Sequence, residues 1–143
     1  ESWDCSNIEF SGIGFGSADY CASTGGDMGK ASLAYGRGKI INAAALYNTL
    51  ALDGVWLDFR DPEGCKEETL YVKTMGFKGR FAIHPDQIKP IHDAYRPAPE
   101  ELEWAKGVLE EAKTAGSGAF KYQGKMVDAP VLAVARLIIS RED

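Results

Sequence analysis

The chain has 143 residues and a formal net charge of −5 at pH 7, and 45% of its residues are hydrophobic while 26% are charged. This length and composition suit one globular domain with a real core. The acidic balance argues against a general nucleic-acid surface, which needs a basic stripe, and the apolar runs are too short to cross a bilayer.

The first 95 residues are predicted to repeat a strand–helix unit. Apolar alternation and β-branched or aromatic content predict three strands, at Ile8–Gly16, Asp53–Phe59 and Gly79–Ile83. Helical spacing and capping residues predict three helices, over at least Gly38–Leu50, from the Asp61 cap to a stop at Gly76, and over His84–Tyr95. Alternating strands and helices indicate βα units and a parallel sheet.

Residues 96–143 are predicted to form a separate extension. A Pro-rich break at Arg96–Glu101 starts a helix from Pro99 to about Ala115. A hairpin is expected around Gln123–Gly124, and an amphipathic helix after Asp128. We therefore divide the chain at 1–95 and 96–143.

The ends of the chain and its cysteines bear on the compartment. The first residues include the acidic Glu1 and Asp4 and lack the basic stretch followed by an apolar core that marks a secretory signal. The absence of an initiator Met indicates a processed, tagged or truncated chain. Cys5, Cys21 and Cys65 are an odd number without CxxC spacing, which favours reduced thiols over disulfides or a zinc site. We expect a cytoplasmic protein, or one of the mitochondrial matrix if the source is eukaryotic.

Polar side chains follow each predicted strand, where the chemistry of parallel α/β folds gathers. Asp19 follows the first strand, Asp58, Arg60 and Asp61 the second, and His84 the third. Asp61 is interpreted as a helix cap. Asp58 is either a buried structural carboxylate or a functional one, and His84 is either a near-core histidine or part of a site.

Asp19 lies just beyond a glycine-rich turn. Gly14 and Gly16 let the backbone approach a ligand, and the amide N–H groups of Ser17–Asp19 could face an anion. The carboxylate suits a hard cation such as Mg²⁺. The alternative is an ordinary loop carboxylate, because a glycine-rich turn with one Asp is a weak signal by itself.

Five segments in series are far more specific. They read "GFGSADYCAS", "GKIINAAAL…LDGVWLDFRDPEG", "MGFKGRFAIHPDQI", "PAPEELEWAKGVLEEA" and "YQGKMVDAP". In this order and spacing the chain resembles the C-terminal half of the citrate lyase β-subunit and malyl-CoA lyase superfamily, which includes citramalyl-CoA lyases. The resemblance runs from about Ile8 to Ile139.

The resemblance implies a fold and a reaction. The fold would be α/β, a partial (β/α)₈ TIM barrel holding the last three βα units in 1–95, with a helical and hairpin lid in 96–143. The reaction would be the Mg²⁺-dependent cleavage or formation of a carbon–carbon bond in a 3-hydroxyacyl-CoA thioester of the malyl, citramalyl or citryl type, with Mn²⁺ as an alternative metal. The partners would be a CoA thioester and a small oxo-acid, and full-length relatives form trimers or hexamers, so we expect a homo-oligomer.

The resemblance also implies roles for single residues. Asp19 would bind the metal, and the backbone of Ser17, Ala18 and Asp19 would face the carboxylate of the oxo-acid.

Two further elements of the site follow from the same resemblance. Ile83, His84 and Pro85 would lie against the CoA moiety. Asp128, in the lid, would act as acid or base in the active site of a neighbouring subunit; its alternative role is an N-cap.

Some features depart from the family pattern. A closed barrel takes about 250 residues, so this chain is too short to close one alone, and Val131 replaces the His that often follows "DAP". We therefore expect the isolated chain to be inactive. Three alternatives stay open: a thioesterase on the same site, a non-catalytic half-barrel that pairs its sheet edges with another chain, and an unrelated α/β fold.

Overall fold

The computed structural model describes residues 10–116 and 118–142. The chain divides into two compact units, Glu1–Tyr95 (unit 1) and Arg96–Asp143 (unit 2), and each is described by itself. That unit 2 acts as a lid stays a prediction. The calls on Glu1, Asp4, Cys5 and Ile8 lie outside the described residues.

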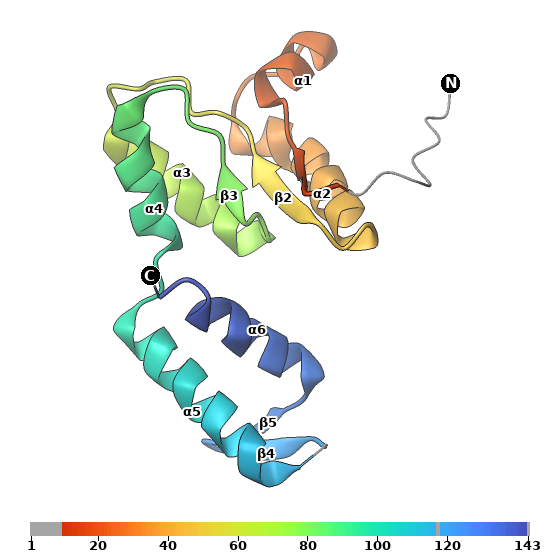
Figure 1. Ribbon diagram of the computed structural model, residues 1–143. Helices are drawn as coiled ribbons and strands as arrows, with labels where there is room; N and C mark the ends of the chain where they lie inside the picture. The colour runs from red at the N-terminus through yellow and green to blue at the C-terminus, as the bar shows by residue number, and fades with distance from the viewer. Residues whose placement is uncertain (1–9, 117, 143) are drawn as a thin grey trace. The chain divides into compact units, whose positions relative to one another are not determined.

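Unit 1 is built on a parallel sheet, as the sequence predicts (Figure 1). Its three strands, β1 (Gly12–Gly14), β2 (Leu50–Asp53) and β3 (Gly79–Arg80), are arranged in the order β1-β2-β3. Ile13 pairs with Ala51 and Leu52 with Gly79, both in parallel register. The sheet is open, so the described residues form part of a barrel and not a closed one.

Helices follow every strand of unit 1. They are α1 (Ser17–Thr24) and α2 (Lys30–Leu46) after β1, α3 (Pro62–Met75) after β2, and the 3₁₀ turn η1 (Pro85–Gln87) with α4 (Ile88–Tyr95) after β3. The predicted limits of α3 are confirmed: the Asp61 carboxylate accepts the Gly64 N–H at 2.9 Å, and Gly76 ends the helix with a left-handed φ of 117°.

Several predicted elements were wrong in their limits. The second strand is Leu50–Asp53, and residues 54–59 form an irregular segment instead of a strand. The helix before it begins at Lys30 and ends at Leu46, because Asn48 turns the chain with a positive φ of 49°. Leu50 therefore belongs to β2, although its apolar side chain continues the helical pattern.

The glycine-rich turn also differs from the prediction. It leads into helix α1, which the sequence analysis missed, so Ser17, Ala18 and Asp19 form the first turn of a helix and not a loop. The first and third strands are shorter than predicted, since only Gly12–Gly14 and Gly79–Arg80 pair as strands.

Apolar packing holds the helices of unit 1 to the sheet. Ala44 on α2, Ala51 on β2, Val72 on α3 and Phe77 before β3 form one buried cluster. A second cluster joins Phe15, Cys21 and Leu33 beneath α1. These clusters fix the βα turns that follow β1 and β2.

Unit 2 has the predicted order of helix, hairpin and helix. Its elements are α5 (Pro99–Ala115), β4 (Phe120–Tyr122), β5 (Lys125–Val127) and α6 (Ala129–Ile139). The hairpin is antiparallel and turns through Gln123 and Gly124, whose positive φ angles of 47° and 77° are typical of the tight turn between two strands. Both helices and the hairpin were predicted.

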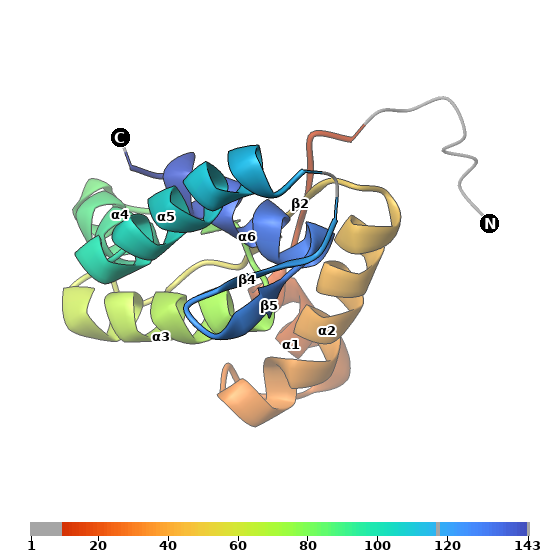
Figure 2. The same ribbon diagram turned by 90° about the horizontal axis from the view of Figure 1, so that it is seen from below.

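The core of unit 2 is small and apolar. Ala105 and Val108 of α5 meet Val127 of β5 and Ala135 of α6. Gly107 lets the hairpin approach α5, because a side chain there would overlap the Tyr122 hydroxyl. Figure 2 shows the hairpin alongside the two helices.

Among the described residues, the structure contains no helix with both the length and the apolar character needed to cross a membrane.

Candidate functional site at the carboxyl ends of the strands

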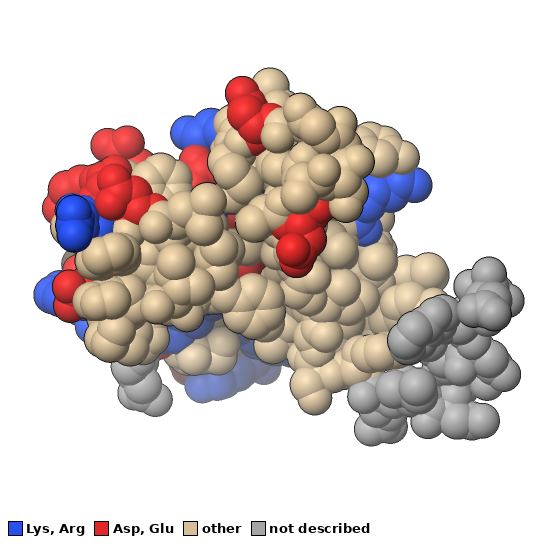
Figure 3. Space-filling model, turned by 90° about the horizontal axis from the view of Figure 1, so that it is seen from above, with Lys and Arg blue, Asp and Glu red and all other residues tan. Residues whose placement is uncertain are grey.

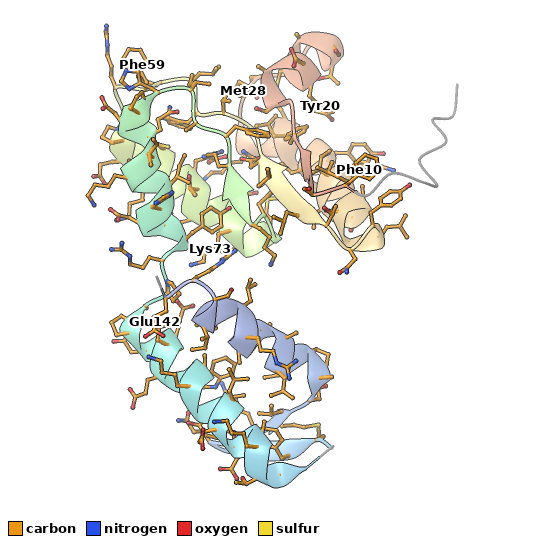
Figure 4. The ribbon with its side chains drawn as sticks, in the orientation of Figure 1. Phe10, Tyr20, Met28, Phe59, Lys73 and Glu142 are labelled. Atoms are coloured by element: carbon orange, nitrogen blue, oxygen red, sulfur yellow. The ribbon has the colours of Figure 1, made fainter. Side chains whose placement is uncertain are left out.

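The carboxyl ends of the three strands meet at one edge of unit 1. Figure 4 shows this edge with Tyr20 and Met28 on the side of α1 and α2, and Phe59 on the side of α4. In the space-filling view of Figure 3, acidic side chains gather beside basic ones at the left, and elsewhere they lie apart on a largely uncharged surface. Several hollows open among the segments that follow the strands. Two of them contain predicted site residues, and a third lies over the buried charged residues Arg37, Glu68 and Arg80, with residues 55–58, Met28 and Leu33 in its lining.

The first hollow contains Asp19 and has a volume of about 330 Å³. It is lined by Gly14–Asp19 together with Val55 and Phe81. These residues follow β1, β2 and β3 respectively, so all three strands contribute to it. We call it the Asp19 pocket.

The N-terminus of α1 gives the Asp19 pocket a positive end. The N-cap residue, Gly16, has no side chain to accept the N–H groups of the first turn. Ser17 donates its N–H to the Phe15 carbonyl at 3.0 Å, whereas helix geometry leaves the N–H groups of Ala18 and Asp19 without acceptors inside the helix. Such groups attract anions.

Asp19 and Ser17 differ in accessibility. Asp19 is exposed, and its carboxylate lies over the backbone of Gly16 at the start of α1. A methyl group added at Gly16 would lie only 3.2 Å from Asp19 Oδ2. Ser17 is buried, its Oγ has no hydrogen-bond partner, and a side chain at Gly54 would overlap it. Of the two side chains, Asp19 is the one open to a ligand.

A buried ion network supports this edge from below. The Asp53 carboxylate, fully buried at the end of β2, accepts Arg37 Nε and Nη2, each at 3.1 Å, and Arg80 Nη2 at 2.5 Å. Glu68 on α3 lies 2.8 Å from Arg37 Nη2. Burial alone would lower the pKa of the Arg37 guanidinium, but its hydrogen bonds and charge attraction with Asp53, and then with Glu68, raise that pKa.

The network positions the floor of the Asp19 pocket. Arg80 Nε donates to the Gly54 carbonyl at 3.0 Å, and the Phe81 N–H donates to the Asp53 carbonyl at 3.1 Å. Gly54 is the residue that packs against Ser17. The ion network therefore fixes the backbone on which both Val55 and Phe81 stand.

The sequence analysis missed this network and left open a buried position for Asp58, which the structure does not show. Asp53 was assigned to the start of a strand, and Arg37 lay outside the predicted helix. Asp58, which the sequence left as a possible buried carboxylate, is exposed, and its Oδ1 accepts the Arg60 N–H at 3.0 Å. A basic residue between small residues on α2 was the available signal for Arg37.

The second hollow lies beside the segment that follows β3. Its volume is about 660 Å³, and its lining includes Phe59 and Pro85. Three basic residues (Arg60, Lys66 and Lys89) and three acidic ones (Glu63, Asp86 and Asp93) also line it, and Lys89 pairs with Asp93 at 2.6 Å. We call it the charged pocket.

His84 lies beside the charged pocket, between Ile83 and the lining residue Pro85. The His84 ring stacks on Phe59 with centroids 4.7 Å apart, and its Nδ1 accepts the Asp86 N–H at 3.2 Å. The His84 side chain is 40% exposed, so it is not the near-core histidine that the sequence allowed. The Ile83 N–H donates to Gln87 Oε1 at 2.9 Å, and the Ile83 side chain is exposed.

Asp128 belongs to unit 2, whereas the other predicted site residues belong to unit 1. Its Oδ1 accepts the Val131 N–H at 3.3 Å, so the N-cap role is confirmed. The residue is exposed. Its catalytic role stays a prediction.

The Asp19 pocket fits a metal ion in part. In the described ranges, 10–116 and 118–142, no group of three or more His, Cys, Asp or Glu side chains could hold a metal. Asp19 would be a single protein ligand. Mg²⁺ is often bound through one or two carboxylates, with substrate and water completing its shell, so one open carboxylate beside an anion-binding helix start is compatible with it.

Comparison with known proteins decides the family. A family model described as C-C bond lyase of the TIM-barrel fold matches residues 38–142. The chain belongs to this C–C bond lyase family. The predicted resemblance is thereby confirmed, and the open parallel sheet of unit 1 is part of a TIM-barrel lyase fold.

Individual relatives agree with this assignment. The chain is 36% identical over 131 residues to the mitochondrial citramalyl-CoA lyase of Rattus norvegicus, covering 88% of this chain and 39% of the relative. It is 39% identical over 137 residues to a citrate lyase subunit beta-like protein of Mycobacterium tuberculosis, covering 91% and 50%. The chain thus spans half or less of the length of these curated relatives.

A solved structure gives the same result. The crystal structure of protein CitE from Mycobacterium tuberculosis, in complex with magnesium, acetoacetate and coenzyme A, superposes with a TM-score of 0.73 at 36% identity. The match covers 92% of this chain and 52% of that one.

Proposed function

We propose that this chain supplies the metal and oxo-acid end of a CoA-ester lyase site, which cleaves or forms a carbon–carbon bond in a 3-hydroxyacyl-CoA thioester. The observation that carries the proposal is the open Asp19 carboxylate at the start of α1, in a pocket shared by the ends of all three strands. A relative named citramalyl-CoA lyase and one solved with magnesium, acetoacetate and coenzyme A support it.

The Asp19 pocket would hold the oxo-acid fragment. Mg²⁺, or Mn²⁺ in its place, would be held by Asp19 and would polarise the oxygen at the bond that breaks. The free N–H groups of Ala18 and Asp19 would bind the carboxylate of the oxo-acid, which is the group that a helix start attracts. Ser17 would contribute by packing against Gly54 and not through its buried hydroxyl.

The charged pocket would hold part of the CoA moiety. Pro85 lines it, directly after Ile83 and His84 in the chain, and the stacked rings of His84 and Phe59 offer an aromatic surface. Its basic side chains would pair with phosphate groups, against the opposing charge of the acidic residues on the same lining.

Asp128 would give or take the proton at the α-carbon of the thioester. The cap and the acid–base role can be separated, because Asn caps a helix about as well as Asp. We expect Asp128→Asn to keep the stability of the parent and to lose turnover by roughly a hundredfold or more. Asp128→Ala should lose both stability and turnover. Parental turnover in Asp128→Asn would rule out the acid–base role.

The central experiment uses the intact gene product. Citramalyl-CoA and malyl-CoA are supplied with Mg²⁺, products are identified by mass spectrometry, and Mn²⁺ binding is followed by electron paramagnetic resonance. Asp19→Ala should weaken Mn²⁺ binding and reduce cleavage by at least roughly a hundredfold. Asp58→Ala is the matched control, since Asp58 is an exposed carboxylate at the same edge outside both pockets. Unchanged turnover in Asp19→Ala would overturn the proposal.

The same assay tests a thioesterase on this scaffold. A thioesterase releases free CoA, whereas a lyase releases a shorter acyl-CoA and an oxo-acid. Free CoA as the first product would replace the lyase proposal with the thioesterase.

A non-catalytic half-barrel is the second candidate, and the open sheet favours it. β1 and β3 are edge strands, and apolar Phe10, Leu50 and Phe81 are partly exposed beside the sheet. Such a chain would pair its edges with another copy. Sedimentation of a soluble monomer by analytical ultracentrifugation would speak against this candidate, while trimers or hexamers of an active intact protein would support the lyase.

A further inference from the structure

Beyond β3, a buried side chain takes over the pairing of two backbone segments. The Phe81 N–H still donates directly to the Asp53 carbonyl, at 3.1 Å. Two residues further on, the Ile83 N–H donates to a side chain instead, Gln87 Oε1, at 2.9 Å. The other end of the same amide, Gln87 Nε2, donates to the Trp56 carbonyl at 2.7 Å.

The Gln87 amide therefore bridges the segment after β2 and the turn after β3. It accepts from one backbone and donates to the other, as a peptide group of an intervening strand would. Gln87 is 1% exposed, and both of its partners belong to this chain. A buried amide with both ends paired is costly to replace by a group that cannot make the same two bonds.

The bridge joins the surroundings of the two pockets. Trp56 directly follows Val55, which lines the Asp19 pocket. Ile83 and His84 directly precede Pro85, which lines the charged pocket. The length of one amide thus sets the spacing between the backbone beside the first pocket and the backbone beside the second.

The segment after β2 has further anchors of its own. Arg80 Nε donates to the Gly54 carbonyl at 3.0 Å. The Trp56 indole packs on the start of α3, where a side chain added at Gly64 would lie 2.8 Å from Trp56 Cζ2. Loss of the Gln87 amide should therefore displace the turn Ile83–Pro85 more than the segment that carries Val55.

We propose that Gln87 is a positioning residue, whose amide holds the turn Ile83–Pro85 at the spacing that the CoA moiety requires. The inference rests on the proposed function, because it takes the CoA moiety to lie against this turn. Gln87 acts through the backbone of Ile83 and Trp56, and not by contact with the reacting atoms. Its loss should weaken CoA binding while the metal end of the site is largely kept.

The first test removes both hydrogen bonds. In the intact gene product, CoA binding is measured by calorimetry and Mn²⁺ binding by electron paramagnetic resonance. Gln87→Met has a side chain of similar size that makes neither bond, and it should weaken CoA binding by about tenfold or more. Mn²⁺ binding should stay within about threefold of the parent, and the KM for the thioester should rise by a larger factor than kcat falls.

The second test makes the bridge depend on pH. In Gln87→Glu, a protonated carboxyl can donate to the Trp56 carbonyl and accept the Ile83 N–H, whereas the ionised form has no donor. Burial raises the pKa of such a carboxyl. CoA affinity relative to the parent at the same pH should therefore be near normal at about pH 5 and about tenfold or more weaker at about pH 8. Gln123→Glu makes the same change at an exposed position of the hairpin and should follow the parent at both pH values.

The outcomes separate the two proposals. If Asp19→Ala loses Mn²⁺ binding while both Gln87 variants bind CoA as the parent does, the proposed function stands and the role of Gln87 is overturned. Equal losses of CoA and Mn²⁺ affinity in Gln87→Met, or a relative affinity of Gln87→Glu that does not change with pH, would also overturn that role. If the parent does not bind CoA, both proposals fall.

Hydrogen exchange of the parent decides the case in which neither Gln87 variant folds, as judged by circular dichroism. The Ile83 N–H, donated to Gln87 Oε1, should exchange slowly and should exchange more slowly still when CoA is bound. An Ile83 amide whose exchange CoA leaves unchanged would overturn the positioning role.

Discussion

The two units of this chain are stabilised by different kinds of interior. In unit 1, four charged side chains (Arg37, Asp53, Glu68 and Arg80) lie buried between the sheet and its helices. In unit 2, the interior is a small apolar cluster around Ala105 and Val108, and its ion pairs lie at the surface. The unit that carries the pocket is thus also the one that contains buried charge.

This difference has a physical meaning. A buried ion network adds little net stability over apolar packing, but it is costly to break and it tolerates few alternative arrangements. Here Arg80 of the network holds the Gly54 carbonyl, and the backbone carbonyl of Asp53 accepts the Phe81 N–H, so the backbone that carries Val55 and Phe81 of the Asp19 pocket is fixed. We infer that the buried charges of unit 1 position the backbone beside the Asp19 pocket, whereas the apolar interior of unit 2 only holds a hairpin and two helices together.

Removing the central carboxylate should give the largest effect. Asp53→Ala leaves two guanidinium groups buried without their shared partner, and we expect a loss of about 3–5 kcal/mol in the free energy of unfolding. Chemical denaturation measures it. Asp58→Ala, which removes an exposed carboxylate five positions later, should cost less than about 1 kcal/mol. Equal costs for the two variants would mean that burial of charge does not distinguish this interior.

The close approach of the hairpin to α5 at Gly107 should give the next largest effect on stability. Gly107→Ala should gain about 1 kcal/mol from helix propensity but lose more by pushing Tyr122 and the hairpin away, for a net loss of about 1–2 kcal/mol. Gly38→Ala on α2 is the control, since an added methyl group there meets nothing within 4 Å. It should stabilise the chain, as measured by the thermal midpoint. A stabilising Gly107→Ala would contradict the packing of the hairpin on α5.

A buried thiol gives unit 1 a smaller, pH-dependent effect. Burial raises the pKa of Cys65, so the folded chain keeps this proton to higher pH than the unfolded chain does. The corresponding stability is fully present below the unfolded pKa of about 8.5 and is lost as the pH rises through the folded value. Denaturation midpoints measured from neutral to alkaline pH should fall less steeply in Cys65→Ala. Parallel curves would argue against a buried thiol.

The surface pairs of unit 2 should give the smallest effect. Glu110 and Lys113 form an exposed pair on α5, with side chains 72% and 70% exposed. We expect Glu110→Gln to change the free energy of unfolding by about 0.5 kcal/mol or less, and to do so less at high salt. A loss comparable with that of Asp53→Ala would remove the contrast between the two interiors.

The sequence predicted unit 2 better than unit 1, for identifiable reasons. Pro99, the Gln123–Gly124 turn and the Asp128 cap are local signals, and each marks the limit of an element. In unit 1 the strands are only two to four residues long, so their limits depend on pairing that lies far apart in the chain. Leu50 was therefore placed in a helix when it begins β2.

The site was predicted in its exposed parts and missed in its buried ones. Asp19 and His84 follow strands in the sequence, and the structure places both at the carboxyl-end edge. The pairing of Arg37 with Asp53 joins two segments that carry no shared motif. The packing of the Phe81 ring on Gly14 of β1 is likewise visible only once β3 is paired with β2.

The order of the strands has a consequence for synthesis. Because β1, β2 and β3 neighbour one another in the same sequence in which the ribosome produces them, each βα segment that emerges finds its partner already made. The sheet can grow outward one strand at a time during translation. Only when Arg80 has emerged does Asp53 gain its second cation, so β3 completes the charge balance of a network that Arg37, Asp53 and Glu68 begin.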